Sequence, residues 1–216
     1  MAGTLPINDF AQVTITSNQP TMITTSISGL RQAKQVAGQF WTVEAEYRNL
    51  TSSEAKTVQG FLSKQRGTLY DFSVVIPVIS DADGGIQLAR AANPAVDDTF
   101  TVASNYSVGA ATIAFTTNFT QGQYTGAGAT TILQAGDYVR FAGHSKVYQV
   151  TEDVVPDGSG NGTMVIYPNL VATVTSGEEL IYNQVPFTVF NTEVAKDTTF
   201  SLGNETQMSL RLQEAL

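Results

Sequence analysis

The chain has 216 residues, of which 42% are apolar and 14% charged; its formal net charge is -8 and it contains no cysteine. This length is enough to bury the core of one large β domain or two small ones. The missing cysteines exclude disulfides, thiolate catalysis and Cys-ligated metal centres. No Lys/Arg cluster is present, which argues against direct nucleic-acid binding, and the low charged fraction favours a protein that hides surface in an assembly.

The N-terminal sequence MAGTLPINDF lacks the basic start and apolar centre of a signal peptide. No apolar run approaches the 18 residues that predict a transmembrane helix. We therefore expect a chain that is made and folded in a cytoplasm.

The first predicted elements are two strands with period-two alternation. In residues 11–17, Val13 and Ile15 alternate with polar residues, which indicates a half-buried strand. A longer strand follows, and its Trp41 face is predicted to lie on the core side. The residues on that face are Gln39, Trp41, Val43, Ala45 and Tyr47, and those on the other face are Phe40, Thr42, Glu44, Glu46 and Arg48.

A helix is predicted directly after this strand. Thr51 and Glu54 have the spacing of a capping box, in which each side chain bonds the backbone N–H of the other residue. Gly67 is placed to end the helix in a left-handed conformation, and residues 70–78 then predict another strand. The apolar positions at helical spacing are Ala55, Val58, Phe61 and Leu62, and Lys64 and Arg66 are expected in the last turn, where they complement the helix dipole.

The middle of the chain has a different character. Residues 81–182 contain 10 acidic and 3 basic residues, a net charge of -7, whereas the rest of the chain has a net charge of -1. Short apolar segments alternate here with Gly-rich turns, which predicts a small barrel or sandwich. The segments are 111–117, 129–143, 146–154 and 162–168.

The alternating pattern of the first part returns near the C-terminus. Residues 186–191 read as a strand, and Met208, Leu210 and Leu212 share one face of a last strand. Such a strand needs a sheet to join, and we expect it to join the sheet of Trp41. The sequence therefore predicts one domain built from both chain ends, residues 1–80 and 183–216, with a separate acidic domain inserted at residues 81–182.

Few residues suggest catalysis or metal binding. His144, the single histidine, is expected as a solvated residue at a hairpin tip, and the adjacent Ser145 would point away from it. Asp81 and Asp83 resemble the start of a calcium loop, but the rest of the EF-hand spacing is missing, which favours an ordinary turn. The acidic pairs Asp97–Asp98 and Glu178–Glu179 are expected in solvated turns.

Cofactor and ligand motifs are equally sparse. Residues 122–128, GQYTGAG, lack the spacing of a phosphate loop and a following helix. Trp41 is favoured as a core residue over a carbohydrate platform. We therefore predict a protein that is not an enzyme, with no catalytic, metal-binding or cofactor-binding residues and no required cofactor.

Three segments resemble the distal tail proteins of long-tailed bacteriophages. The first is residues 31–72, and the third runs from residue 186 to the C-terminus. The second, residues 133–170, contains the AGDY turn, the YQVT strand and the strand GTMVIYP. The matching positions of the first segment are Arg31, Gln39, Trp41, Glu54, Phe61, Leu62, Gly67, Tyr70 and Phe72, and the second segment's motifs are residues 135–138, 148–151 and 162–168.

This resemblance implies a mainly β fold: a sandwich-like belt domain with one α-helix, built from both chain ends, and an inserted barrel of the oligonucleotide/oligosaccharide-binding type. It implies a structural virion protein in a ring, usually a homohexamer, that joins the tail tube to the tail hub, baseplate and receptor-binding fibres. The ring would be assembled in the bacterial cytoplasm. A fold label does not make the insert a nucleic-acid binder.

Two other functions remain open from the residues. A carbohydrate-binding module on the virion could use exposed tyrosines of the insert, and a tail-tube or tail-completion protein would also form a β-rich ring. A hydrolase is disfavoured because no set of nucleophile, base and orienting group is visible. The candidate glycan-binding tyrosines are Tyr106, Tyr124 and Tyr138.

Overall fold

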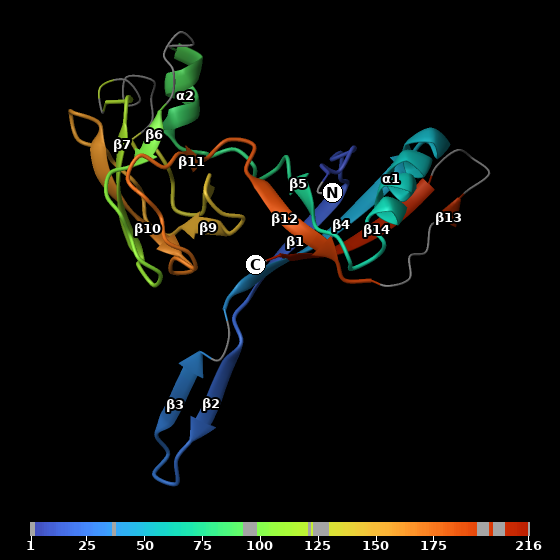
Figure 1. The fold of residues 1–216 in the computed structure, drawn as a ribbon, viewed down its shortest axis with the longest axis horizontal. Helices are drawn as coiled ribbons and strands as arrows, with labels where there is room; N and C mark the ends of the chain where they lie inside the picture. Colours follow the sequence, from blue (N-terminus) through green and yellow to red (C-terminus); the bar gives the residue numbers. More distant parts are fainter. Residues whose placement is uncertain are drawn as a thin grey trace. The chain divides into compact units, whose positions relative to one another are not determined.

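The computed structural model describes residues 3–35, 38–92, 99–120, 122, 130–193, 199–200 and 206–215. The chain divides into two compact units (Figure 1). The first unit comprises residues 1–74 and 188–216, and the second comprises residues 75–187.

The first unit is organised around a six-stranded sheet. Its strand order is β1-β4-β14-β12-β5, with β13 paired to β14, so strands from both chain ends alternate in one sheet. The bounds are β1 (Gln12–Asn18), β4 (Phe40–Leu50), β5 (Phe72–Val75), β12 (Pro186–Asn191), β13 (Thr199–Phe200) and β14 (Thr206–Glu214).

The long strand β4 has the predicted two faces. Trp41, Val43 and Tyr47 are buried, whereas Glu44 and Glu46 on the opposite face are exposed. The terminal strand β14 pairs antiparallel with β4, with Leu212 opposite Val43, and the backbone N–H of Trp41 donates to a carboxylate oxygen of Glu214. The prediction that the last strand joins the sheet of Trp41 is confirmed.

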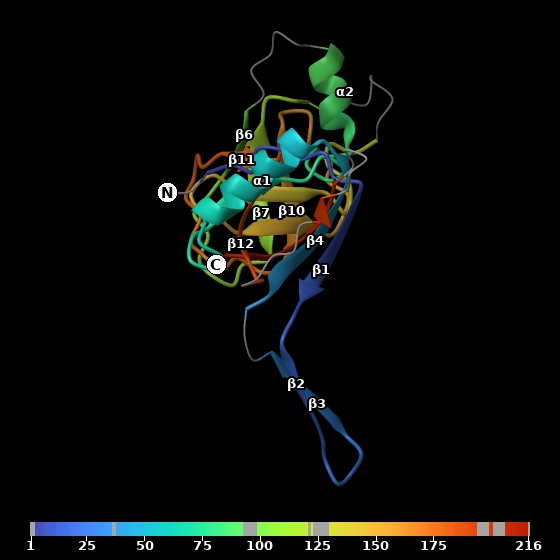
Figure 2. The same cartoon turned by 90° about the vertical axis from the view of Figure 1, so that its right-hand side faces the viewer.

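Helix α1 (Ser52–Lys64) packs against β4 and β14 (Figures 1 and 2). The predicted capping box is present: Thr51 accepts from the N–H of Glu54, and the Glu54 carboxylate accepts from the N–H of Thr51. The predicted end is corrected, because the helix stops at Lys64 and Arg66 already has a φ of 54°. Arg66 thus lies beyond the last turn, and Gly67, with φ 67°, continues the left-handed turn.

Between β1 and β4 the chain forms a hairpin of β2 (Thr21–Thr25) and β3 (Arg31–Gln35). These strands pair with each other in a separate two-stranded sheet. The sequence pattern did not predict this hairpin.

The second unit is a six-stranded, nearly closed barrel with the order β11-β8-β9-β10-β7-β6. A bridge between Thr101 and Glu179 brings the two end strands together. The bounds are β6 (Phe100–Val102), β7 (Thr112–Thr117), β8 (Tyr138–Phe141), β9 (Val147–Val150), β10 (Asn161–Tyr167) and β11 (Leu180–Ile181).

A short helix, α2 (Gly85–Ala92), also belongs to the second unit and was not predicted. Ile86 and Ala89 of this helix are fully buried in the barrel core. The segment before the helix approaches the backbone of Ile132 so closely that a side chain at Gly84 would collide with the Ile132 carbonyl. Only glycine fits at this contact.

The chain enters and leaves the second unit through hydrogen-bonded segments. The N–H of Val185 donates to the carbonyl of Ser80 at 2.9 Å, and the N–H of Ala82 donates to the carbonyl of Tyr182 at 3.0 Å. The mainly β fold class, with a sandwich-like part and a barrel, is confirmed. The inserted domain at residues 81–182 stays a prediction.

Candidate assembly surfaces

The hairpin β2–β3 is the most exposed apolar feature of the first unit. All ten residues of its two strands are exposed. Met22 and Ile23 on β2 are 63% and 56% exposed, and Leu30 before β3 is 69% exposed. Apolar side chains gathered in this way on a surface mark an interaction site more often than single scattered ones do.

The tip of the hairpin is a hydrogen-bonded turn that presents Ile27. The N–H of Gly29 donates to the carbonyl of Ser26, and the Ser26 hydroxyl oxygen accepts from the N–H of Leu30 at 3.2 Å. Gly29 has a φ of 79°, which suits glycine in a turn. Ile27 is fully exposed, so the turn holds an apolar side chain in solvent.

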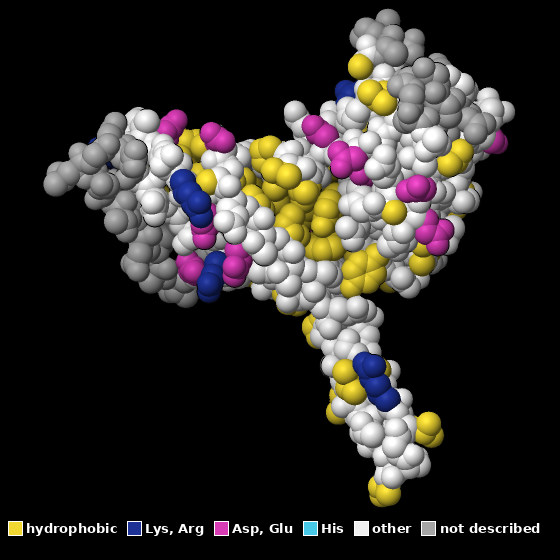
Figure 3. All heavy atoms as spheres, turned by 180° about the vertical axis from the view of Figure 1, so that it is seen from behind, with side chains coloured by type: hydrophobic (Ala, Val, Ile, Leu, Met, Phe, Trp, Pro, Cys, Tyr) yellow, Lys and Arg dark blue, Asp and Glu magenta, His cyan; other side chains and the backbone are white. Residues whose placement is uncertain are grey.

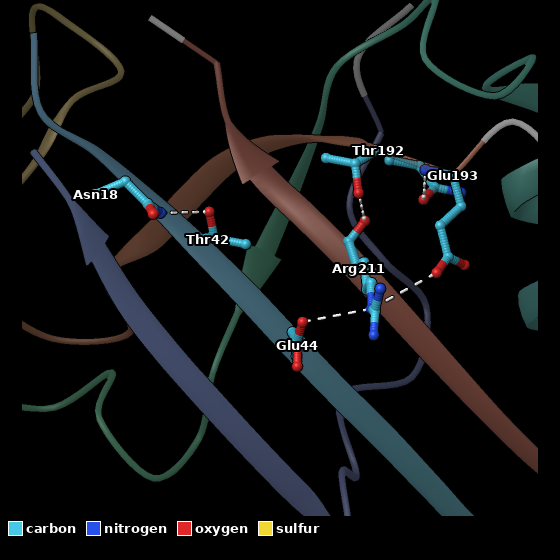
Figure 4. Close-up of polar contacts among 7 residues, drawn as sticks. Asn18, Thr42, Glu44, Thr192, Glu193 and Arg211 are labelled. Carbon is cyan, nitrogen blue, oxygen red and sulfur yellow. Dashed lines mark hydrogen bonds and ion pairs between the residues drawn. The ribbon is translucent and has the colours of Figure 1, made fainter. Parts of the chain in front are cut away.

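The outward face of the main sheet is polar, in contrast to the apolar hairpin. Arg211 on β14 lies 3.3 Å from Glu44 on β4 and 3.7 Å from Glu193 after β12 (Figure 4). On the same sheet, the side-chain amide of Asn18 donates to the hydroxyl of Thr42 at 2.7 Å. Because these polar groups already have partners, this face is typical of a surface that faces water.

The two end strands of the main sheet differ in how their edges are covered. The edge of β5 bonds residues near the N-terminus: Leu5 donates to the Ser73 carbonyl, and Ser73 donates to the Gly3 carbonyl. Within the described residues, β1 pairs with β4 alone. The second edge of β1 therefore offers backbone groups to another strand.

The second unit has a pocket of about 160 Å³ where its first residues meet the turn before β8. Asp137 is 7% exposed and its carboxylate accepts from the N–H groups of Asp83 and Gln134. Burial raises the pKa of Asp137, and the neighbouring Asp83 charge adds to the rise. The lining residues are Val78, Ile79, Asp81, Asp83, Gln134, Ala135, Gly136, Asp137 and Tyr138.

His144 lies in the turn between β8 and β9, as expected, but the prediction that it is solvated is wrong. Its ring stacks on Phe141 with 5.7 Å between centroids and meets Tyr148 edge-on at 5.5 Å. Neither ring nitrogen has a hydrogen-bond partner among the described residues. Burial lowers the pKa of His144.

Glu178 is half-buried and bridges two turns of the barrel, so the expectation of a solvated acidic pair is wrong for this residue. One carboxylate oxygen accepts from the N–H of Gly143 at 2.8 Å and the other from the N–H of Thr175 at 3.1 Å. Glu179 is exposed, as expected. The Glu178 carboxylate therefore stabilises these two turns.

The other candidates do not come together. Asp81 accepts from the N–H of Gln184 in the segment that leaves the unit. Tyr106 is half-buried and its hydroxyl accepts from the N–H of Ala114, and Tyr138 packs on Phe187. These two tyrosines therefore do not form an open aromatic platform. Asp97, Asp98, Tyr124 and residues 123–128 of the GQYTGAG segment lie outside the described residues.

No group of three or more metal-ligating side chains occurs in the described part of the chain. Within that part, no helix is long and apolar enough to cross a membrane. The surface features that stand out are therefore the apolar hairpin and the acidic pocket. Sequence reasoning missed both, although the absence of Asp and Glu between Asp9 and Glu44 marked the hairpin segment.

Comparison with known proteins gives one finding about family. Residues 123–185 match the model described as "Distal tail protein pb9, B domain". The match supports a bacteriophage distal tail protein with a structural role in the tail, which confirms the resemblance found in the sequence motifs. No curated protein matches the chain.

Proposed function

Since residues 123–185 place this chain with bacteriophage distal tail proteins, we propose that it forms a closed ring at the distal end of the tail tube. The ring joins the tube to the tail hub or baseplate and to the receptor-binding apparatus. The match to the distal tail B domain is the observation that carries this proposal. The sixfold symmetry comes from the family resemblance, because no feature of a single subunit determines the number of subunits in the ring.

Two features of the first unit support assembly into a ring. The edge of β1 that has no strand partner among the described residues and the apolar hairpin β2–β3 are different surfaces of the same subunit. Contacts between two different surfaces are head-to-tail, and they give a ring when the rotation between subunits closes. Low charge also suits interfaces, whose centres are depleted in charged residues.

The acidic second unit then serves as the attachment surface for other tail proteins. It carries a net charge of -7 in residues 81–182, which keeps the assembled particle soluble and disfavours direct binding to DNA. Tyr106 and Tyr138, two of the candidate glycan-binding residues, are packed in this unit, which favours the attachment role over an open glycan platform.

The test is deletion of the gene in the phage, followed by electron microscopy of the lysate. We expect assembled heads with absent or tipless tails, and infectivity should return when the gene is supplied in trans. Complete tails with intact tips on infectious particles would refute the proposal. Light scattering of the purified protein should give a mass several times the 23.1 kDa subunit, and the multiple gives the ring order.

A further inference from the structure

The hairpin β2–β3 carries two exposed cations. Arg31 and Lys34 are exposed, and neither has an ion pair among the described residues. The sequence contains no Asp or Glu between Asp9 and Glu44, so the hairpin is positive in an otherwise acidic chain. Figure 3 shows Lys/Arg and hydrophobic side chains together on this hairpin. Its partner should therefore combine an apolar contact with negative charge.

The pocket of the second unit has this combination. Val78 at its rim is 84% exposed, and Ile79 adds an apolar wall. Asp81 and Asp83 are exposed, and the Asp83 carboxylate has no hydrogen bond or ion pair in the described part of the chain. None of the three basic residues of the insert lines the pocket. A cation placed here would offset the repulsion between Asp83 and the buried Asp137.

We propose that the hairpin tip of one subunit docks into this pocket on a second copy of the chain, with Ile27 against Val78 and Arg31 beside Asp83. The pocket volume of about 160 Å³ suits one large aliphatic side chain together with part of a guanidinium group. Arginine fits a carboxylate-lined site because its planar fork binds carboxylate oxygens in pairs. The contact is head-to-tail and rests on the proposed ring.

Cysteine cross-linking tests the contact directly, because the native chain has no cysteine. Full-length Ile27→Cys and Val78→Cys proteins, carrying different tags, are mixed under mild oxidation. We expect a disulfide-linked heterodimer as the main product. Lys56→Cys, at an exposed position on α1, replaces Ile27→Cys in the control and should give little cross-link. Equal yields from both mixtures, or linkage mainly between two Ile27→Cys chains, would overturn the proposal.

A charge exchange tests the ion pair by sedimentation of the full-length protein. Arg31→Glu should weaken self-association by about tenfold or more, and adding Asp83→Lys in the same chain should restore most of it. Lys56→Glu makes the same change in net charge and should have little effect. If the wild type assembles and Arg31→Glu assembles equally well, the docking contact is wrong while the ring stands. A wild type that remains monomeric at all concentrations would overturn both.

Discussion

Replacement of Leu210 by alanine tests whether the last strand of the chain holds the core of the first unit. Leu210 is fully buried at the centre of β14, opposite Ala45 of β4. Ala45 is too small to fill the cavity that the lost Leu210 side chain would leave, and the central position in the strand limits how far other neighbours can move into it. Buried Leu→Ala changes cost about 2–5 kcal/mol of unfolding free energy, and we expect a value within this range.

The assay uses the single tryptophan, Trp41, which is 3% exposed and lies in the same sheet. Its fluorescence during urea unfolding reports the first unit. With a slope of about 2 kcal/mol per molar urea, the midpoint should fall by about 1–2.5 M. Ser209→Ala is the matched control, because the neighbouring Ser209 is exposed and its change should stay within about 0.5 kcal/mol. Equal shifts for both variants would refute this account of the core.

Three further changes test local features. Thr51→Ala should lower the unfolding free energy by about 1 kcal/mol at neutral pH. Because the hydrogen bonds from Thr51 lower the pKa of Glu54, the stability difference from wild type should shrink as the pH falls below the ordinary Glu range. A pH-independent difference in urea titrations would contradict the capping box. Gly160→Ala should destabilise the barrel by about 1–3 kcal/mol, because Gly160 has a φ of 81° and the added methyl group would meet the carbonyl at the end of β7. Gly158→Ala is the control, since its added methyl group meets no atom within 4 Å. Equal melting temperatures of the two variants by circular dichroism would refute this. Burial lowers the pKa of His144, so the barrel should lose stability as the pH falls through the ordinary His range towards that lowered pKa. NMR titration of this single histidine measures the pKa. A pKa at or above the ordinary value would contradict the buried ring.

The long elements that bury one face were predictable from the sequence, whereas the exposed hairpin β2–β3 and the short helix α2 were not. In β4 the alternation of Trp41, Val43 and Tyr47 with charged residues matches the burial in the structure. The hairpin β2–β3 has no buried face, so its sequence lacks the contrast that marks a strand. Helix α2 has eight residues and follows a Gly-rich turn, which leaves too few apolar repeats to show its period.

The surroundings of individual polar residues depend on contacts between distant segments. His144 reads as a hairpin residue from its neighbours, but its burial comes from packing on Phe141 and Tyr148. Glu178 is 35 residues from Gly143, the turn residue whose N–H it accepts. Local sequence predicts turns through Gly, Asp and Ser, but it does not show which side chains reach across from another strand.

The charges of the first unit distinguish a face that suits water from one that suits a partner. On the outer sheet face, Arg211 lies between two carboxylates, and Arg48 pairs with Glu46. On the hairpin, Arg31 and Lys34 have no ion pair among the described residues and stand beside exposed apolar side chains. An isolated hairpin of this kind is at best marginally stable in water, and its apolar surface favours aggregation. A second protein surface that covers the apolar side chains and pairs the cations removes both costs, which is why assembly explains the hairpin better than a free monomer does.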